Sequence, residues 1–273
     1  MAATTSSMAT PLRLALSRLV GWLADRRVPK PLRAPVYRTY ARLTGAQLDE
    51  VRLPLDAYPS LCAFFVRELV PGARPLAPEL DVLPSPVDGR VQSIGTVSAG
   101  DLLQAKGQSY SVDELVGGPL PGVDLEGASA WTIYLSPRDY HRIHAPVDCR
   151  LEQVRWRGGA RYSVAPKVLA RTPRVLCTNE RAVLHLHSEE HGPFVLVLVG
   201  ALNVGRIRVR GVPPAHEGAP PQPLHFERGG ELGRFEMGST IVLLWPAGRA
   251  TPAEALEPGS PLRLGEPIGR LTP

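Results

Sequence analysis

The chain has 273 residues, 44% of them hydrophobic and 21% charged, so it can bury a core as one large domain or two small ones. Its formal charge of +5 and pI near 9.4 favour an anionic partner. The sequence contains no helix-turn-helix, zinc-finger or aromatic RNA-binding pattern, so we expect no nucleic-acid partner.

Cysteine usage and hydropathy exclude two further classes of protein. Cys62, Cys149 and Cys177 are odd in number and widely spaced, which argues against a disulfide framework and against a thiolate metal site. We expect Cys149 and Cys177 to pack in the core, and we expect no metal site. No uncharged apolar run reaches the ~18 residues of a membrane-spanning helix, so the sequence predicts none.

The N-terminal part combines helical apolar spacing with positive charge. From Pro11 to Ala24 the apolar residues follow a helical period, and Trp22 lies near the end of this stretch. Residues 1–53 contain nine Lys and Arg against three acids, a net charge of +6 (9 − 3). A short basic amphipathic helix with a tryptophan is typical of an interfacial anchor on an anionic membrane. A helix packed on its own domain explains the apolar pattern equally well.

Two more helices are expected before residue 75, over 34–49 and over Ser60–Glu68, with Ser60 as the N-cap. After residue 75 short apolar runs bounded by Gly and Pro predict strands. The clearest runs are Val91–Val97, Trp131–Leu135, Phe194–Val199 and Ile241–Trp245. A brief helix is expected over 109–116 and an exposed proline-rich loop over 211–223.

These elements predict an α+β fold that is mainly β, with an antiparallel β core and N-terminal amphipathic helices. We expect two regions: residues 1–75, helical and membrane-associating, and residues 76–273, a β-rich catalytic domain.

The most informative motif is Gly238-Ser239-Thr240, which directly precedes the apolar run Ile241–Trp245. A serine hydroxyl placed after a glycine can reach the preceding carbonyl, because glycine has no side chain to shield it and tolerates strained geometry. Two other segments, around Asp88 and around His144, supply an acid and a base. Asp, His and Ser together are the components of an activated hydroxyl nucleophile.

Each of these residues also has an ordinary structural interpretation. Asp88 before glycine is typical of a turn, His144 of a satisfied core histidine, and Ser239 of a strand-start hydroxyl. His185 and His187 alternate on one predicted strand, and without a third ligand nearby we interpret them as surface residues.

Taken in order along the chain, the motifs resemble those of bacterial phosphatidylserine decarboxylases, pyruvoyl-dependent enzymes made as self-cleaving proenzymes. The resemblance runs from about residue 10 to the C-terminus. The segments that carry it are Phe64–Arg67, Pro71–Pro75, Pro86–Gly89, Leu103–Gly107, Tyr134–Pro146, Asn179–Arg181, Val199–Ala201 and Glu236–Thr240. Three places depart from the family pattern: Met237 replaces a frequent leucine, Arg161 stands where an apolar residue is usual, and the loop 211–223 is unlike its counterpart. Only Arg161 bears on the substrate pocket.

The resemblance implies a role for each candidate residue. His144 would take the proton of the Ser239 hydroxyl, with Asp88 orienting the imidazole, and Ser239 would attack the carbonyl of Gly238. The chain would then be cut into a β subunit, 1–238, and an α subunit, 239–273. The α subunit would begin with a pyruvoyl group made from Ser239, the covalent cofactor. Its carbonyl would form a Schiff base with phosphatidylserine and release CO2 to give phosphatidylethanolamine.

His141 is the candidate acid that reprotonates the product carbanion. In an extended segment His141 and His144 would point to opposite faces, so joint action requires a bend around Arg142-Ile143; otherwise His141 is a bystander. From the resemblance we also expect a homodimer of processed αβ pairs, bound peripherally to the cytoplasmic side of the cell membrane, with phosphatidylserine in an anionic bilayer as partner.

Three alternatives remain open at this stage. A Ser-His-Asp hydrolase is the first, although the chain lacks a Gly-x-Ser-x-Gly elbow. A pyruvoyl decarboxylase of a soluble amino acid is the second, and the basic N-terminus argues for a lipid instead. The third is a non-catalytic lipid-binding β protein, which would have no need of the acid, the two histidines and the serine.

Overall fold

The structure is a computed structural model that describes residues 21–105, 108–201, 206–236 and 238–272. Its body is built on one large sheet. The strands of that sheet are β2 (Gly89–Thr96), β5 (Ser129–Leu135), β7 (Cys149–Arg157), β8 (Arg181–Ser188), β9 (Gly192–Gly200), β11 (His225–Phe226), β13 (Ser239–Trp245) and β15 (Pro261–Leu262). Their order is β11-β7-β8-β9-β13-β5-β2-β15, and every neighbouring pair is antiparallel.

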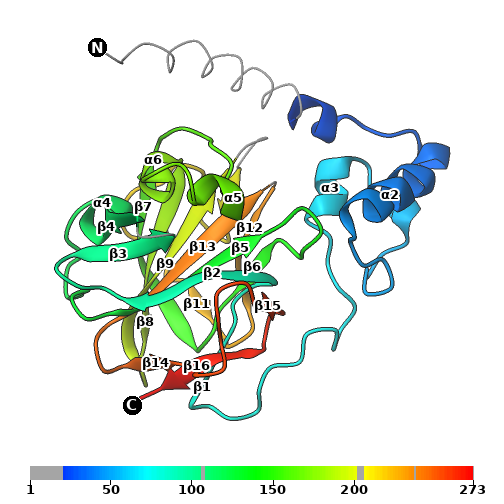
Figure 1. Ribbon diagram of the computed structural model, residues 1–273. Coiled ribbons are helices and arrows are strands. Elements are labelled where there is room, and N and C mark those ends of the chain that lie inside the picture. The colour runs from blue at the N-terminus through cyan, green and yellow to red at the C-terminus, as the bar shows by residue number, and fades with distance from the viewer. Residues whose placement is uncertain (1–20, 106–107, 202–205, 237, 273) are drawn as a thin grey trace, which may run out of the picture.

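Smaller elements cover both faces of this sheet (Figure 1). One face carries two three-stranded sheets, β1 (Val82–Pro84) with β16 (Pro267–Leu271) and β14 (Ala250–Pro252), and β10 (Ile207–Val209) with β12 (Glu231–Phe235) and β6 (Arg142–His144). The other face carries β3 (Asp101–Ala105), β4 (Gln108–Ser111), α4 (Val112–Val116), α5 (Pro166–Leu169) and α6 (Val175–Thr178).

Burial on both faces explains the continuous apolar run Ile241–Trp245 of the central strand β13. All seven residues of β13 are buried. Ile241 and Leu243 belong to one hydrophobic cluster and Val242 and Leu244 to the other, because successive side chains of a strand point to opposite faces. A continuous short apolar run is therefore the expected pattern for this strand.

The N-terminal helices form a separate small packing unit beside the β body (Figure 1). It contains α2 (Lys30–Thr44), a 3-10 turn over Leu55–Ala57 and α3 (Leu61–Phe65). Tyr37, Tyr58 and Phe64 make up its core, with the Tyr37 and Phe64 rings stacked at 4.8 Å. We call residues 21–75 the helical region; that it is a domain of its own stays a prediction.

The predicted fold class and the four predicted strands are confirmed. Ser60 is the N-cap of α3, since its hydroxyl accepts a hydrogen bond from the Ala63 amide at 3.1 Å. The loop 211–223 is mostly exposed and contains neither a helix nor a strand.

Three helix boundaries were wrong. The helix predicted over 34–49 spans Lys30–Thr44 instead, because Pro31 favours the first turn of a helix and Gly45, at φ 83°, ends it in the left-handed conformation. The predicted 109–116 helix begins as strand β4, and only Val112–Val116 is helical. α3 ends at Phe65 rather than Glu68. Most of the predicted 11–24 helix lies outside the described residues, of which 21–25 are helical.

Two glycines of β2 give a matched test of this packing. A Cβ on Gly89 would lie 2.5 Å from the backbone oxygen of Tyr134, whereas one on Gly95 would meet only the end of the Leu102 side chain at 3.8 Å. We expect Gly89→Ala to destabilise the fold by about 1–3 kcal/mol in urea unfolding, and Gly95→Ala to change it by about 0.5 kcal/mol or less. Equal effects of the two substitutions would show that the backbone at Gly89 has room for a Cβ atom.

Candidate active site

The Gly238–Ser239 junction lies where the chain enters the central sheet. Gly238 has φ 37°, in the region that favours glycine. Ser239 is the first residue of β13 and pairs with Leu135 on β5 and with Gly200 on β9. The serine is fully buried, and its Oγ has no hydrogen-bond partner among the described residues. An unsatisfied buried hydroxyl costs about 1–3 kcal/mol, and such groups occur at reactive sites. A serine that is converted into a ketone fits this position, because the structure makes no other use of its hydroxyl.

Helix α3 packs over the segment that leads to this junction. The Cys62 thiol approaches the carbonyl oxygen of Glu236 at 3.7 Å. The Phe65 ring lies 4.0 Å from the His141 ring, centroid to centroid. The amide of Phe235, at the end of β12, donates to the carbonyl of His141 at 3.0 Å. His141 and α3 are therefore both next to the last residues before Gly238.

His141 is a fully buried, neutral imidazole. Its Nδ1 lies 2.8 Å from the carbonyl oxygen of Asp139, which fixes the proton on Nδ1 because a carbonyl can only accept. Its Nε2 then carries a free lone pair and has no partner among the described residues. Burial lowers the pKa of His141 to about 3; the Asp139 carbonyl opposes this effect and the charge of Arg67 adds to it.

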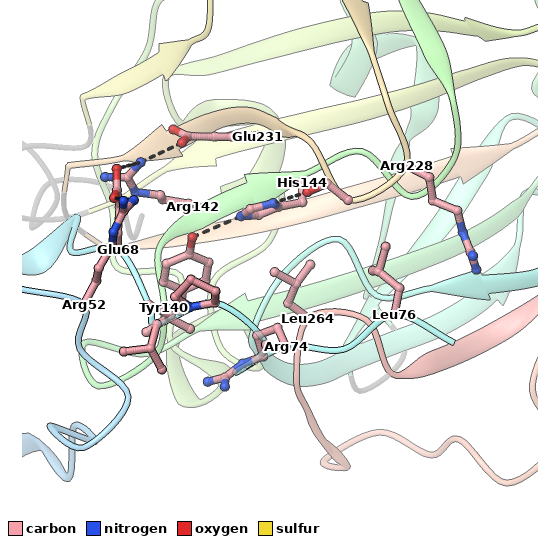
Figure 2. A pocket seen from close by; sticks show the side chains of 15 residues that line it. Arg52, Glu68, Arg74, Leu76, Tyr140, Arg142, His144, Arg228, Glu231 and Leu264 are labelled. Atoms are coloured by element: carbon pink, nitrogen blue, oxygen red, sulfur yellow. Dashed lines mark hydrogen bonds and ion pairs between the residues drawn. The ribbon is translucent and has the colours of Figure 1, made fainter. Parts of the chain in front are cut away.

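His144 is held by two hydrogen bonds (Figure 2). Its Nδ1 donates to the carbonyl of Gly229 at 2.7 Å, and its Nε2 accepts from the Tyr140 hydroxyl at 3.1 Å. Burial lowers the pKa of His144, while the Gly229 carbonyl and the charges of Glu231 and Asp88 raise it. A neutral imidazole is suited to accept a proton at neutral pH, but the lone pair of Nε2 is engaged by the Tyr140 hydroxyl in this structure.

The two histidines do not converge on one point. Arg142–His144 is the extended strand β6, so the bend around Arg142-Ile143 that joint action would need is absent. His141 and Ile143 face the core, whereas His144 faces a cavity. In the antiparallel pairing of β6 with β12, His144 lies opposite Glu231, at the far end of β12 from Gly238.

Asp88 is bound by groups other than a histidine. Arg74 donates to both of its carboxylate oxygens, at 2.8 and 2.7 Å, and the Leu264 amide donates at 2.8 Å. Arg74 also pairs with Glu50 of the helical region at 2.8 Å. The direct Asp88–His144 hydrogen bond expected of a triad is not present between these two residues, because their polar atoms are bonded to other partners. The contribution of Asp88 to His144 is electrostatic: its charge opposes the lowering of the His144 pKa by burial.

Asp88 and His144 border two neighbouring cavities. The His144 cavity, about 450 Å³, is also lined by Arg142 and Glu231, which pair at 2.6 Å (Figure 2). The second, about 280 Å³, contains Asp88. Tyr140 and Arg74 line both cavities, and Ser239 lines neither.

Tyr140 and Arg74 lie within sequence motifs, but the sequence did not predict a role for either residue. Tyr140, four residues before His144, was the available signal. No sequence signal identified the partners of Asp88, because only the fold brings Arg74 and Leu264 next to it.

The remaining residues singled out from sequence have structural roles. Arg161 pairs with Glu180 through two nitrogens, at 3.0 and 2.7 Å, so its charge is compensated. Cys149 and Cys177 are buried as expected. His185 is only 9% exposed, so its interpretation as a surface residue was wrong: β8 is paired on both sides. Across the described part of the chain, no group of three His, Cys, Asp or Glu side chains is placed to hold a metal ion.

The buried state of His141 leads to a prediction about acid stability. Its folded pKa of about 3 lies below the usual 6.5, so the unfolded chain binds the proton first. Above pH 6.5 His141 is neutral in both the folded and the unfolded chain, so its burial does not lower the free energy of unfolding. As the pH falls towards about 3, the unfolded chain gains a proton that the folded chain does not bind, and the free energy of unfolding decreases. We expect His141→Gln, in an uncut Ser239→Ala background, to reduce the loss of unfolding free energy between pH 6.5 and 5 by up to about 1.4 kcal/mol per pH unit.

Urea unfolding at several pH values measures this difference. The exposed His225 gives a matched control for replacing a histidine by glutamine, and the pH profile of His225→Gln is compared with that of His141→Gln. Parallel pH profiles for the parent and His141→Gln would contradict the prediction.

Comparison with known proteins identifies the family of this chain. The family profile for phosphatidylserine decarboxylase matches residues 61–270. The phosphatidylserine decarboxylase proenzyme of Marinobacter nauticus is 40% identical over 97% of this chain and 96% of its own. Those of Myxococcus xanthus and of an Anaeromyxobacter species are 38% and 40% identical, covering 94% and 93% of this chain and the same shares of their own. The matched region includes Asp88, both histidines and Ser239, and the chain belongs to the phosphatidylserine decarboxylase family.

Proposed function

We propose that this protein decarboxylates phosphatidylserine to phosphatidylethanolamine after cutting its own chain between Gly238 and Ser239. The observation that carries the proposal is the Ser239 hydroxyl, buried and unpartnered directly after a glycine with positive φ, in a member of a decarboxylase family. The cut separates residues 1–238 from 239–273.

Self-cleavage begins with an exchange of the amide for an ester. His144 removes the Ser239 hydroxyl proton, and the oxygen attacks the Gly238 carbonyl carbon, so that the C–N bond breaks and the serine nitrogen becomes an amine. Loss of the Ser239 α-proton then expels Gly238 as a carboxylate and leaves a dehydroalanine. Water hydrolyses this group to a pyruvoyl group and ammonia.

In the uncut chain the Nε2 of His144 accepts from Tyr140, and Ser239 lies outside the cavity that His144 faces. Two changes therefore have to precede the proton transfer: the Tyr140 hydrogen bond opens, and the His144 ring and the Ser239 hydroxyl come together. The geometry also changes the role proposed for Asp88. Held by Arg74, it favours the imidazolium through its charge, which offsets a small part of the lowering of the His144 pKa by burial. The Gly229 carbonyl orients the ring instead.

The pyruvoyl group supplies a carbonyl that accepts the electron pair released when CO2 leaves. This chain's residues then have to exclude water and return a proton. His141 is our candidate for the proton transfer, because its Nε2 is unpartnered and its backbone is bonded to Phe235, three residues before Gly238. The ring is neutral, so Nε2 first takes up a proton, which the ammonium group of the substrate supplies, and then returns that proton to the product. The Phe65 ring over His141 shields it from water.

The first test is the state of the chain. We expect Ser239→Ala to remain one inactive polypeptide of about 29.5 kDa, because the hydroxyl is both the nucleophile and the precursor of the ketone. The wild type should give two fragments by intact mass, the smaller one reactive towards a hydrazine. An uncut wild type that still hydrolyses esters would favour a Ser-His-Asp hydrolase. A cut protein that acts only on a free amino acid would favour a soluble substrate.

The second test separates the two histidines. We expect His144→Ala to slow cutting at least 100-fold, the lower range of general-base catalysis, and Asp88→Asn to slow it by less. His141→Ala should cut and then lose turnover. Fragment yield on a denaturing gel and CO2 release from the cut fraction measure the two steps separately. An uncut His141→Ala protein together with a cut His144→Ala protein would reverse the assignment.

We propose further that the helical region binds the membrane. The outer face of α2 exposes Leu32, Val36 and Leu43, which lie within about 40° of one another on a helical wheel. Lys30, Arg38 and Arg42 are exposed on the same helix. Before α2, Trp22 is 53% exposed beneath the guanidinium of Arg26. Exposed apolar residues flanked by cations fit an anionic bilayer surface.

Within the described residues, no helix has the length and apolarity needed to cross a bilayer. Peripheral attachment to the cytoplasmic face of the cell membrane, and a homodimer of αβ pairs, complete the proposal.

Vesicle flotation tests the membrane face. We expect the triple substitution Leu32→Gln, Val36→Gln and Leu43→Gln to reduce binding to vesicles containing phosphatidylserine at least tenfold, because apolar contact with the bilayer is lost. Leu80→Gln is the matched control, since Leu80 is 65% exposed outside the helical region. Undiminished flotation of the triple variant, with normal cutting, would place the membrane contact elsewhere.

A further inference from the structure

Arg67 is a buried cation that pairs with no carboxylate among the described residues. It is 3% exposed. Its Nη2 donates to the backbone carbonyl of Arg138 at 3.0 Å, and the Phe64 ring lies 5.3 Å from its guanidinium carbon. Its Nε and Nη1 have no hydrogen-bond partner among the described residues. A guanidinium stays protonated in proteins, so burying two of its donors without partners is costly unless an anion compensates the charge.

The nearby acids are already bonded to other groups. Arg74 occupies both oxygens of Asp88 and one oxygen of Glu50. Asp139 accepts from the amide and the hydroxyl of Ser136, both at 2.7 Å. These carboxylates are therefore satisfied, while Arg67 is not.

Arg67 lines the cavity of about 280 Å³ that lies between the helical region and the β body. Four arginines and three acids surround this cavity, which gives a net charge of +1 (4 − 3). The arginines are Arg67, Arg74, Arg138 and Arg263. The side chain of Arg138 is 49% exposed and lies where solvent can reach it.

We propose that this cavity, which we call the Arg67 cavity, binds a phosphate-type oxyanion between the helical region and the β body. Guanidinium groups match phosphate oxygens in geometry and charge, and Arg67 has two donors without a partner among the described residues. Both donors are buried, so binding requires the Arg67 side chain to turn towards the anion in the cavity. The cavity volume is ample for a phosphate group. The anion is either the headgroup phosphate of a phospholipid or free phosphate. The proposal does not depend on decarboxylation, so failure of the proposed function would leave it standing.

Thermal unfolding of the full chain tests the site. In the uncut Ser239→Ala background, inorganic phosphate should raise Tm in a saturable way at constant ionic strength, because an anion bound only by the folded state stabilises it. Chloride at matched ionic strength and acetate should not do so. A larger effect of glycerophosphoserine than of phosphate assigns the site to a lipid headgroup, and the reverse assigns it to free phosphate.

Substitutions locate the binding. We expect Arg67→Gln to weaken the apparent phosphate affinity at least tenfold. Arg138→Gln should weaken it less and keeps the backbone carbonyl that holds Arg67, so it provides the test if Arg67→Gln does not fold. Arg270→Gln, at an arginine 74% exposed and outside the cavity, is the control and should bind like the parent. No stabilisation beyond chloride, equal stabilisation by acetate, or unchanged affinity in both cavity variants would overturn the proposal.

Discussion

The pairing of β13 with β5 on one side and β9 on the other determines what the site can do. It buries Ser239 at the start of a strand in which every other residue is also buried, so that water cannot solvate the hydroxyl. A shift of one residue would exchange the two faces of β13 and put its side chains into the wrong clusters, so the register is strongly fixed. The hydroxyl therefore stays buried at the start of β13, directly after Gly238 in the chain. The same pairing would hold residues 239–273 in the sheet after a cut.

The helical region contacts the site at several independent points. Arg142 donates through two nitrogens to the Val66 carbonyl, both at 3.0 Å. Asp25 forms an ion pair with Arg206 at 2.6 Å, and Arg74 forms ion pairs with both Glu50 and Asp88. A surface that binds a membrane through α2 would thus be linked by ion pairs to the acid of the site. Binding of an anion in the Arg67 cavity would strengthen the same junction.

Sequence reasoning succeeded where the information was local. Runs such as Ile241–Trp245 specify buried strands, and Ser60 specifies a helix start through its own hydroxyl. It failed where a single local residue overrode a pattern, as Gly45 did in ending α2. It also missed pairs that only the fold creates: Leu264 lies 176 residues from Asp88, and no spacing rule anticipates that its amide occupies the carboxylate. The candidate residues could be predicted from the sequence, but the groups that hydrogen-bond to them could not.

The extended form of β6 has a further consequence for the two histidines. Side chains three positions apart on a strand face opposite sides, so no sliding of β6 along β12 can turn both rings towards Ser239 at once. A slide of one residue would expose His141 and bury Arg142, whose charge is paired with Glu231. His141 is dry and His144 borders a cavity, so they differ in access to water and to substrate. Two imidazoles in such different surroundings suit two separate proton transfers, one before the chain is cut and one after.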